Sequence, residues 1–553
     1  SRIAHEITPP GSIVELIRQT NILDDSDFVS VGDHGLTFTP IEGHGATLTS
    51  LLDSATPFSP IDAAMPGSAQ AMTDFIVDTG NTLKALAAAE QADGSDDGVF
   101  AVREDMLEGT FVNGERVAEA PKLEDHMPAG AASMENSPAG SSEPLLTTSE
   151  SSVSVAVSVE VHAGGNNMMN TAFINNSWLS STVMAAVGNH VEINAIVQSN
   201  VWSDVDAIGA SVDGWKIDAE DVTGSFNIAM FTRIDPGAMD SAAPALSDSD
   251  FPKNWAVTTI NGDLITMNWV QQFSFVTDDD IHVLSASGSH TTVTTGENIL
   301  GNDVSLQDLG LYYDLIIVGG SLYDGNFIQQ MNVLLDDDFV AGVSGFETTG
   351  NASLSTSGNL LWNEANITNI GGADRFEALP DAYRQLAEDF ASGSRDIPLD
   401  VLLDPAFAGL AGIRVLYITG NVIDLQYISQ VNVLGDADQV ALAMNATSQA
   451  FPEADWTVST GSNALVNVAQ IIDVDTQGKT YVGGDHYSDE ILIQAELVSD
   501  TPQYGTQSPD QLVNEAVAFL TDDDLSPIQV DDPTHMHTTH DCIPTDPMQS
   551  VVS

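Results

Sequence analysis

The side chains in this sequence best suited to chemistry are aspartates that recur in pairs, with one residue between the two acids. Carboxylates gathered in turns are typical ligands of hard cations, and Ca²⁺ is the natural candidate outside cells. We therefore expect the paired carboxylates to converge in turns and some of them to hold Ca²⁺. For any single pair, the alternative is an acidic surface without an ion site. The pairs are Asp25/Asp27, Asp204/Asp206, Asp278/Asp280, Asp336/Asp338 and Asp436/Asp438.

Each of the last four pairs closes a repeat unit with strict internal spacing. A glycine opens the unit, a glutamine follows ten residues later, usually with an asparagine two residues beyond it, and the first aspartate stands sixteen residues after the glycine. Near the N-terminus, Ile17, Gln19 and Asn21 repeat the centre of the unit without its glycine. The unit markers are Gly188/Gln198/Asn200, Gly262/Gln272/Ser274, Gly320/Gln330/Asn332, Gly420/Gln430/Asn432 and, in a diverged last copy, Gly484/Gln494/Glu496.

The centre of the unit reads as a β-strand with amides on one face. Residues two apart share a face of a strand, so Ile328, Gln330, Asn332 and Leu334 point the same way. Amides flanked by apolar residues are typical of stacked strands in which each amide bonds to its equivalent above and below. The alternative is that the amides face water. The pattern predicts a mainly β fold, a repetitive β-solenoid or β-helix-like array with a few peripheral α-helices.

A second asparagine motif leads into each unit. The asparagine is followed two residues later by a small apolar residue and four residues later by a larger one, at Asn170, Asn227, Asn302, Asn363 and Asn467. From this asparagine to the glycine of the unit the distance is 18, 35, 18, 57 and 17 residues. Insertions in repeat proteins map to loops on one side. We expect such loops in units two and four, namely an acidic stretch over 235–252 and an amphipathic helix over 374–391.

The composition excludes several classes of partner. The chain has 80 Asp and Glu against 14 Lys and Arg, a formal net charge of −66. Phosphate backbones and anionic membranes both need clustered basic residues, so we expect no nucleic-acid partner and no membrane surface. Self-repulsion on this scale favours a medium rich in cations. The single cysteine, Cys542, precludes an intramolecular disulfide, and no apolar run is long enough to span a membrane.

The chain divides by composition into five segments. Residues 1–35 hold the orphan half-repeat, 36–127 form a mixed region with a helix over 69–91, and 128–151 read as a linker rich in Ser, Pro and Gly. The five-unit array occupies 152–500, opening on an alternating strand, and 501–553 contain a helix over 511–520 and a tail. In that tail, His535, His537, His540 and Cys542 could ligate a transition metal, but a terminal His cluster is more often adventitious.

The sequence contains no recognisable catalytic motif. It lacks the nucleophile elbow, the HExxH zinc motif, the phosphate-binding loop and the dinucleotide fingerprint. The few basic residues of the array do not recur at one repeat position, and a catalytic site is normally made once, whereas the acids recur in every unit. We therefore expect no enzyme. The alternative is a Ca²⁺-dependent β-helix that binds or cleaves polysaccharide, because some pair of acids lies at a suitable distance by chance.

The units GGSLYDGNFIQQMNVLLDDD and TGNVIDLQYISQVNVLGDAD, with SGNLLWNEANITNIGG and the small and apolar tail residues, resemble large alphaproteobacterial proteins exported by type I secretion. The resemblance covers about 152–500 and the tail. It implies export, and hence an extracellular or cell-surface location. The calcium-binding nonapeptide GGxGxDxUx of repeat-in-toxin proteins is absent, so no functional residue carries over.

Together these patterns predict a secreted structural protein, a fibre, surface-layer or matrix subunit with adhesion as an added role. Its expected partner is itself, head to tail, with extracellular polysaccharide as a further one. The orphan strand within 13–29 can cap its own array or insert into that of the next subunit, because it satisfies its backbone only by joining a sheet. We favour insertion into the next subunit.

Overall fold

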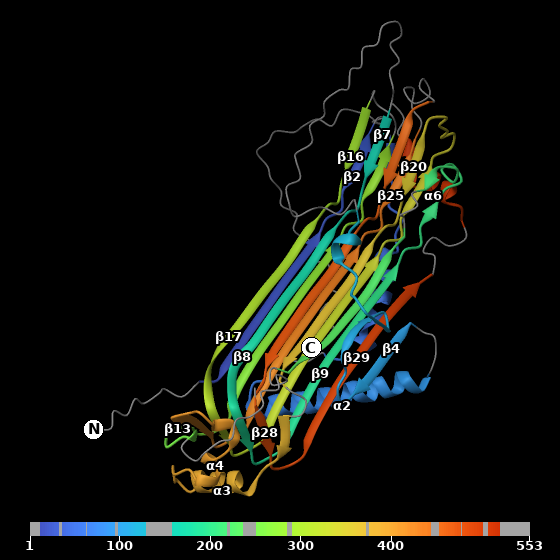
Figure 1. Cartoon of the computed structure of the whole chain (residues 1–553). Coiled ribbons are helices and arrows are strands. Elements are labelled where there is room, and N and C mark those ends of the chain that lie inside the picture. The colour runs from blue at the N-terminus through green and yellow to red at the C-terminus, as the bar shows by residue number, and fades with distance from the viewer. Residues whose placement is uncertain are drawn as a thin grey trace, which may run out of the picture.

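The computed structural model describes residues 11–31, 36–61, 64–93, 98–128, 158–217, 222–235, 250–284, 290–371, 375–443, 453–476, 478–500 and 507–519. The body is elongated and built mainly of long, nearly parallel strands, with a few helices at its side and ends (Figure 1). The linker, most of the acidic insertion in unit two and the tail with its His/Cys cluster lie outside the described residues. The mainly β prediction is confirmed.

One sheet carries the unit glutamines, and we call it the Gln sheet. All its strands are parallel except the last, which is antiparallel. Their order is β1 (Ile13–Asp24), β14 (Leu264–Thr277), β24 (Val422–Gly435), β18 (Leu322–Leu335), β9 (His190–Ser203), β29 (His486–Ser499) and β4 (Val99–Glu104).

The facing sheet carries the second asparagine motif, and we call it the lead-in sheet. Its order is β13 (Asn254–Ile260), β23 (Gly412–Ile418), β17 (Ile299–Val318), β8 (Asn167–Ala186), β27 (Ala464–Val474), β21 (Leu360–Ile370), β12 (Gly224–Ile234), β5 (Gly109–Val112) and β6 (Glu115–Val117). At one end, β28 (Lys479–Val482) joins β8, and β22 (Phe376–Ala378) joins β28.

Two short sheets prolong these at the far end of the body, beyond the Asp pairs. The first continues the Gln strands as β10 (Ala207–Ile208), β19 (Phe339–Gly342), β25 (Gln439–Leu442), β15 (Ile281–Leu284) and β2 (Phe28–Val31). The second precedes the lead-in strands as β11 (Lys216–Ile217), β20 (Ala352–Ser355), β26 (Asp455–Ser459), β7 (Ser158–His162) and β16 (His290–Thr294).

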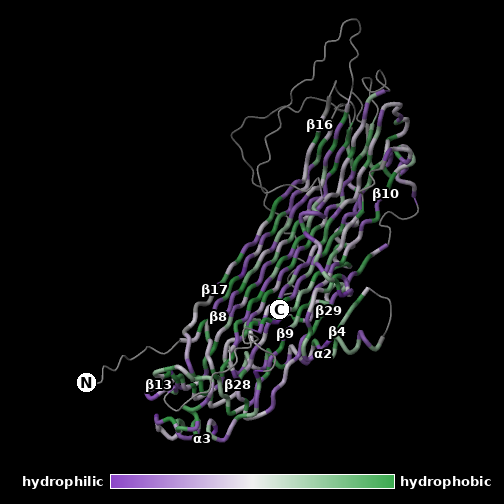
Figure 2. Tube along the Cα trace, viewed as in Figure 1, coloured by the Kyte–Doolittle hydropathy of each residue, from purple (hydrophilic) through white to green (hydrophobic). Residues whose placement is uncertain are grey.

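The predicted amide column is present between the two sheets. Each glutamine donates from Nε2 to Oε1 of the next over 2.8 to 2.9 Å, along Gln494, Gln198, Gln330, Gln430, Gln272 and Gln19. The same Nε2 groups also donate to backbone carbonyls of the lead-in sheet. Hydrophilic and hydrophobic residues alternate along these strands (Figure 2), and isoleucines above and below the amides fill the space between the sheets.

The units do not stack in chain order. Along the Gln sheet they stand in the order two, four, three, one, five, from β14 to β29. In a solenoid each coil lies on the coil before it. What the structure confirms is therefore the stacking of equivalent strands in register, while the solenoid prediction is not confirmed.

The long insertions follow from this order. The lead-in strands of units two and four, β12 and β21, lie at one end of the stack, whereas their Gln strands, β14 and β24, lie at the other. The chain must therefore cross the stack within each of these units. It enters the Gln strand through an additional strand, β13 or β23. The insertions predicted as loops on one side are these crossover connections.

The crossover of unit four contains α3 (Asp381–Ala391) and the single-turn α4 (Leu399–Leu402), which cover β23 and the ends of β8 and β17. We predicted a helix starting at Asp374. It begins only at Asp381, because Pro380 has extended backbone angles and its ring excludes a preceding helical turn. Tyr383, Leu386 and Phe390 are buried as expected.

The N-terminal region packs on the array. Strand β1 pairs with β14 of the same chain, Gln19 opposite Gln272, so this structure has the fold-back arrangement of the orphan strand. Helices α1 (His44–Ala55) and α2 (Ala69–Asp93) cover the outer face of the Gln sheet. The helix predicted over 511–520 is shorter, α6 (Pro509–Ala516), and continues as β30 (Val517–Phe519), paired with β3 (Leu36–Phe38). None of the described helices has the length and hydropathy of a membrane-spanning segment.

Replacing one glutamine of the column tests how much stability it carries. We expect Gln430→Ala to lower the free energy of unfolding by about 2 to 4 kcal/mol, because it leaves Gln330, Gln272 and the Val468 carbonyl short of a partner inside the protein. Urea unfolding followed by circular dichroism measures this. The control is Gln385→Ala on the exposed side of α3, which should change stability by less than about 0.5 kcal/mol; equal effects of the two would contradict the role of the column.

Candidate functional site

The predicted Asp pairs form two columns at the ends of the Gln strands. In the second column, one carboxylate oxygen of every residue except Asp27 accepts the backbone N–H of the equivalent residue in the neighbouring strand, over 2.7 to 3.1 Å. The order is Asp27, Asp280, Asp438, Asp338 and Asp206. These carboxylates hold the turns after the Gln strands in register, so the structure brings the predicted residues together.

The other oxygen of the second column faces the loops that begin the lead-in strands. Thr460 donates to Asp338, and Thr356 donates to Asp206. The register of β7 and β26 puts Ala163 where the loop of unit five has Thr460. The corresponding oxygen of Asp438, which is fully buried, has no donor among the described residues.

The first column is bound by a second set of asparagines. Asn298 donates to Asp278, Asn463 to Asp436 and Asn359 to Asp336. The other oxygens of Asp336 and Asp436 are buried and have no donor among the described residues. Each of these asparagines stands four residues before a lead-in asparagine. This spacing, which our sequence analysis missed, could have identified them as partners of the aspartates.

A glycine lets these loops approach the columns. Gly164 and Gly461 have positive φ, and a Cβ on Gly164 would lie 2.6 Å from the Gly461 carbonyl oxygen and 3.0 Å from a carboxylate oxygen of Asp436. A side chain at either position would separate the loops from the acids. The recurring glycine is therefore needed for close contact between the loops and the aspartates, as well as for the turn.

The columns concentrate negative charge away from water. Asp336, Asp338, Asp436 and Asp438 are all fully buried, and no ion pair links them to a Lys or Arg among the described residues. Burial, and then the neighbouring carboxylates, raise the pKa of all four well above the usual range. The pKa of Asp278 rises to about 7 for the same reasons. At the ends of the columns Asp25 and Asp204 are half-buried and Asp27 is exposed.

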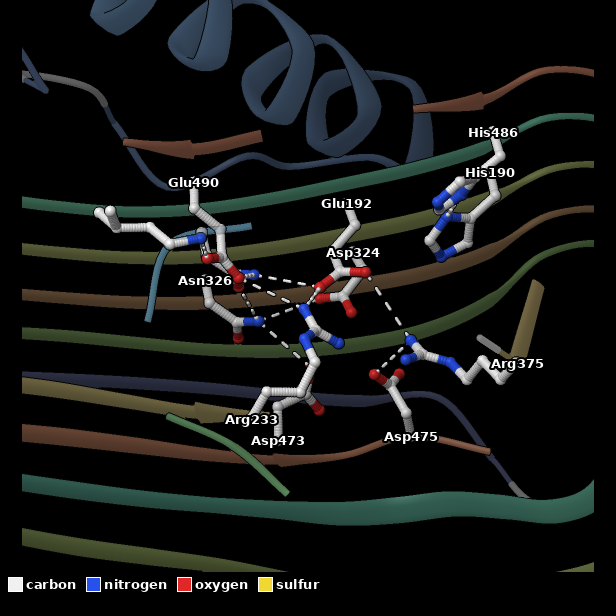
Figure 3. Close-up of polar contacts among 12 residues, drawn as sticks. His190, Glu192, Arg233, Asp324, Asn326, Arg375, Asp473, Asp475, His486 and Glu490 are labelled. Carbon is white, nitrogen blue, oxygen red and sulfur yellow. Dashed lines mark hydrogen bonds and ion pairs between the residues drawn. The ribbon is translucent and has the colours of Figure 1, made fainter. Parts of the chain in front are cut away.

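A second acidic site lies at the opposite ends of the Gln strands, and sequence analysis did not find it (Figure 3). We call it the acid cluster. It contains Glu192, Asp324, Asp424 and Glu490 from the Gln sheet, Asp473 and Asp475 at the end of β27, and two arginines, Arg233 and Arg375. The first three acids stand four residues after the glycine of their units, a spacing that could have been noticed.

The two arginines neutralise only one side of the acid cluster. Arg233 lies 2.8 Å from Glu192 and 3.3 Å from Glu490, and Arg375 lies 2.6 Å from Asp475 and 3.7 Å from Glu192. Burial opposes ionisation of Glu192, but both arginine charges outweigh it and lower its pKa to about 2. Burial, followed by the charge of Asp424, raises the pKa of Asp473 to about 7.

A separate hollow of about 380 Å³ lies beside β4, β5 and β29. Glu496, Gln494 and Asn113 line it together with one aromatic residue, Phe100. A long groove lined by aromatic residues would favour the polysaccharide alternative, and this hollow has one aromatic ring.

Comparisons with protein-family models, with curated proteins and with solved structures found no match to this chain. The geometry of the chain itself is therefore the guide to its function.

A threonine at position 163 tests whether the loop hydroxyls bind the second Asp column. Ala163→Thr should raise the free energy of unfolding by about 1 kcal/mol, because its hydroxyl can donate to the orphaned oxygen of Asp438. Thr460→Ala, the reverse change at the equivalent position, should lower it by about 1 to 3 kcal/mol. Guanidinium unfolding in the presence of a chelator measures both. A destabilising Ala163→Thr together with a neutral Thr460→Ala would refute this pairing.

Proposed function

We propose that the protein is a secreted, self-assembling structural subunit of an extracellular fibre, surface layer or matrix. The observation that carries this proposal is the difference between the two ends of the stack. At one end of the two long sheets, which we call the closed end, the antiparallel strands β4 and β5, with β6 beside β5, cover the edges of β29 and β12. At the other end, which we call the open end, no described strand pairs with the outer edge of β1 or of β2.

The closed end has a partner for the amide column. Gln494 is the first glutamine of the column, and its Oε1 accepts a hydrogen bond from the backbone N–H of Gly114 over 2.8 Å. The free carbonyl oxygen at this end of the column is therefore satisfied within the chain. Strand β4 covers the edge of β29 from Glu490 to Ala495. Such covering strands are how native proteins prevent edge-to-edge pairing.

The open end lacks these protections. Gln19 donates to the carbonyl of Asp303, and the column contains no further glutamine to receive its second N–H. The outward side chains of β1 are uncovered, with Val14 53%, Leu16 50% and Ile22 70% exposed. A strand edge with exposed apolar residues and unpaired backbone groups is a template for another chain.

Exchange of β1 between copies fits these features. All twelve residue pairs between β1 and β14 follow the pattern that the Gln strands share, so β1 of another copy fits the same edge equally well. Exchange of an identical element is a low-cost route to oligomers, and a head-to-tail contact that does not close gives a filament. The acidic composition and the resemblance to exported proteins support an extracellular location.

Ca²⁺ is the ligand we propose for the Asp columns. The buried, donor-free oxygens of Asp336 and Asp436 need a proton or a cation, and oxygen ligands suit Ca²⁺. At a hundredfold excess over its Kd, an ion bound only to the folded chain adds about 2.7 kcal/mol. Because bound cations replace protons, calcium should also change how stability depends on pH.

In chelator, the melting temperature should fall as the pH rises from about 4 to about 7. The column acids have folded pKa values raised above the unfolded value of about 3.9, so in this window the folded state binds more protons, and each such carboxyl lowers stability by about 1.4 kcal/mol per pH unit. Calcium should reduce this slope and raise the melting temperature near neutral pH. Scanning calorimetry measures both, and melts that superimpose with and without calcium would disprove the calcium proposal.

Engineered disulfides test the exchange of β1. Arg18 lies opposite Gln271 in the register, with Nη2 2.8 Å from Oε1. In a Cys542→Ser background, refolding a mixture of Arg18→Cys chains and Gln271→Cys chains should give covalent dimers on non-reducing gels, because only an exchanged strand brings the two thiols together.

The matched control mixes Arg18→Cys with Gln385→Cys, whose positions are not in register, and it measures random collisions. A third sample carries both Arg18→Cys and Gln271→Cys in one chain. If that sample forms only the intramolecular bond at every protein concentration, and the mixture gives no more dimer than the control, β1 is not exchanged and this route of assembly is wrong.

A further inference from the structure

The outer face of the lead-in sheet carries a surface without charged residues, which we call the neutral face. It crosses the adjacent strands β17, β8, β27, β21 and β12 on the side that points away from the amide column. One row across these strands is Ser305, Phe173, Gln470, Asn366 and Met230. The next row is Gln307, Asn175, Ile472, Thr368 and Thr232. A third row continues on three of the strands with Ser177, Ile370 and Ile234.

The absence of charge on this face is unusual for this chain, in which 17% of the residues are charged and the net charge is −66. The acids Asp303 and Glu364 stand one row away, at the border of the face. There the segment with β6 and η2 (Leu123–Asp125) packs on the sheet through Leu123 and Met127. The remainder of the face extends over three rows of uncharged side chains.

Among the described residues, nothing else packs on the neutral face. The inner faces of the two sheets cover each other, and α1 and α2 pack on the outer face of the Gln sheet. On the neutral face, by contrast, Phe173 is 37% exposed and Ile234 47% exposed. Phe173, Met230 and Ile472 belong to none of the hydrophobic clusters that the described residues form. Because parallel sheets occur almost only with both faces covered, a partner is expected here.

The charge of the chain favours a second copy of the same face as that partner. Two copies with a net charge of −66 repel each other wherever their carboxylates meet, and a buried carboxylate must also lose its water. Contact through two neutral faces avoids both effects. The amides and hydroxyls of the face each donate and accept hydrogen bonds, so the face is complementary to an identical one.

We propose that the neutral faces of two copies pack against each other about a two-fold axis, as a lateral contact between subunits. The proposal rests on self-assembly as the function, but it uses a surface separate from the edge of β1. Five strands and three rows cover about 480 Å² on each copy, so the contact buries about 1,000 Å² in total, the lower limit for a specific interface. Such a contact is weak between two free subunits and strong between fibres, in which many copies engage at once.

Sedimentation velocity of the full chain over a range of protein concentrations tests this contact. The chain carries Cys542→Ser, Arg18→Cys and Gln271→Cys, and its oxidised monomer has β1 locked into its own array, so β1 cannot exchange. We expect this locked chain to form reversible dimers. Adding Gln470→Glu and Asn366→Asp, which place charge in the middle of the face with little change of shape, should weaken dimerisation about tenfold or more. Gln307→Glu, at an exposed position on β17, serves if that variant does not fold.

The matched control adds the same charge elsewhere on the locked chain, with Asn81→Asp on α2 and Gln511→Glu on α6, both at exposed positions. It should dimerise like the locked chain itself. A locked chain that stays monomeric at every concentration, or a folded face variant that dimerises as well as the control, would show that the neutral face is not a contact between copies. Fibres formed by the unlocked chain would still support assembly through β1 in either case, so the two proposals fail separately.

Discussion

The structure depends on burying side-chain amides that are satisfied by one another and by the backbone carbonyls of the facing sheet. Six glutamines lie in one column between two sheets, and five of them are less than 3% exposed. A strand that slipped by two residues would keep its faces but could place an isoleucine against a glutamine, such as Ile328 against Gln430. That slip would leave both ends of the amide without partners, at about 1 to 3 kcal/mol for each group. Register is therefore specified by the amides, while the apolar residues beside them supply most of the driving force for packing.

The same constraint explains why the order of the units is free to vary. Every Gln strand presents the same amide at the same height, so any one of them satisfies any neighbour. Their order is decided by the connections. The two long crossovers allow unit two to enter the stack beside β1, and unit four to enter between units two and three. Contacts between residues far apart in sequence dominate as a result, and such topologies fold slowly.

The register of the strands could be predicted from the sequence, but the order of the units could not. Spacing alone identified the Gln strands, their stacking and the convergence of the Asp pairs, because these depend on features that each unit repeats. The neighbours of each strand were not predictable, since identical amides carry no information about order. In the acid cluster, the spacing of Glu192, Asp324 and Asp424 after their unit glycines could have been noticed. The position of Arg233 on a facing strand could not, because only the fold brings it to these acids.

The interleaved order has a consequence for how the chain can be made. In a repeat protein stacked in sequence, the first units can fold while later ones are still being synthesised or exported. Here β27, from the last unit, lies in the middle of the lead-in sheet between β8 of the first and β21 of the fourth. The two long sheets are therefore incomplete in any N-terminal segment that ends before β27 and β29. We expect the two long sheets to close only after almost the whole array has left the ribosome, so most of the chain waits for its last strands.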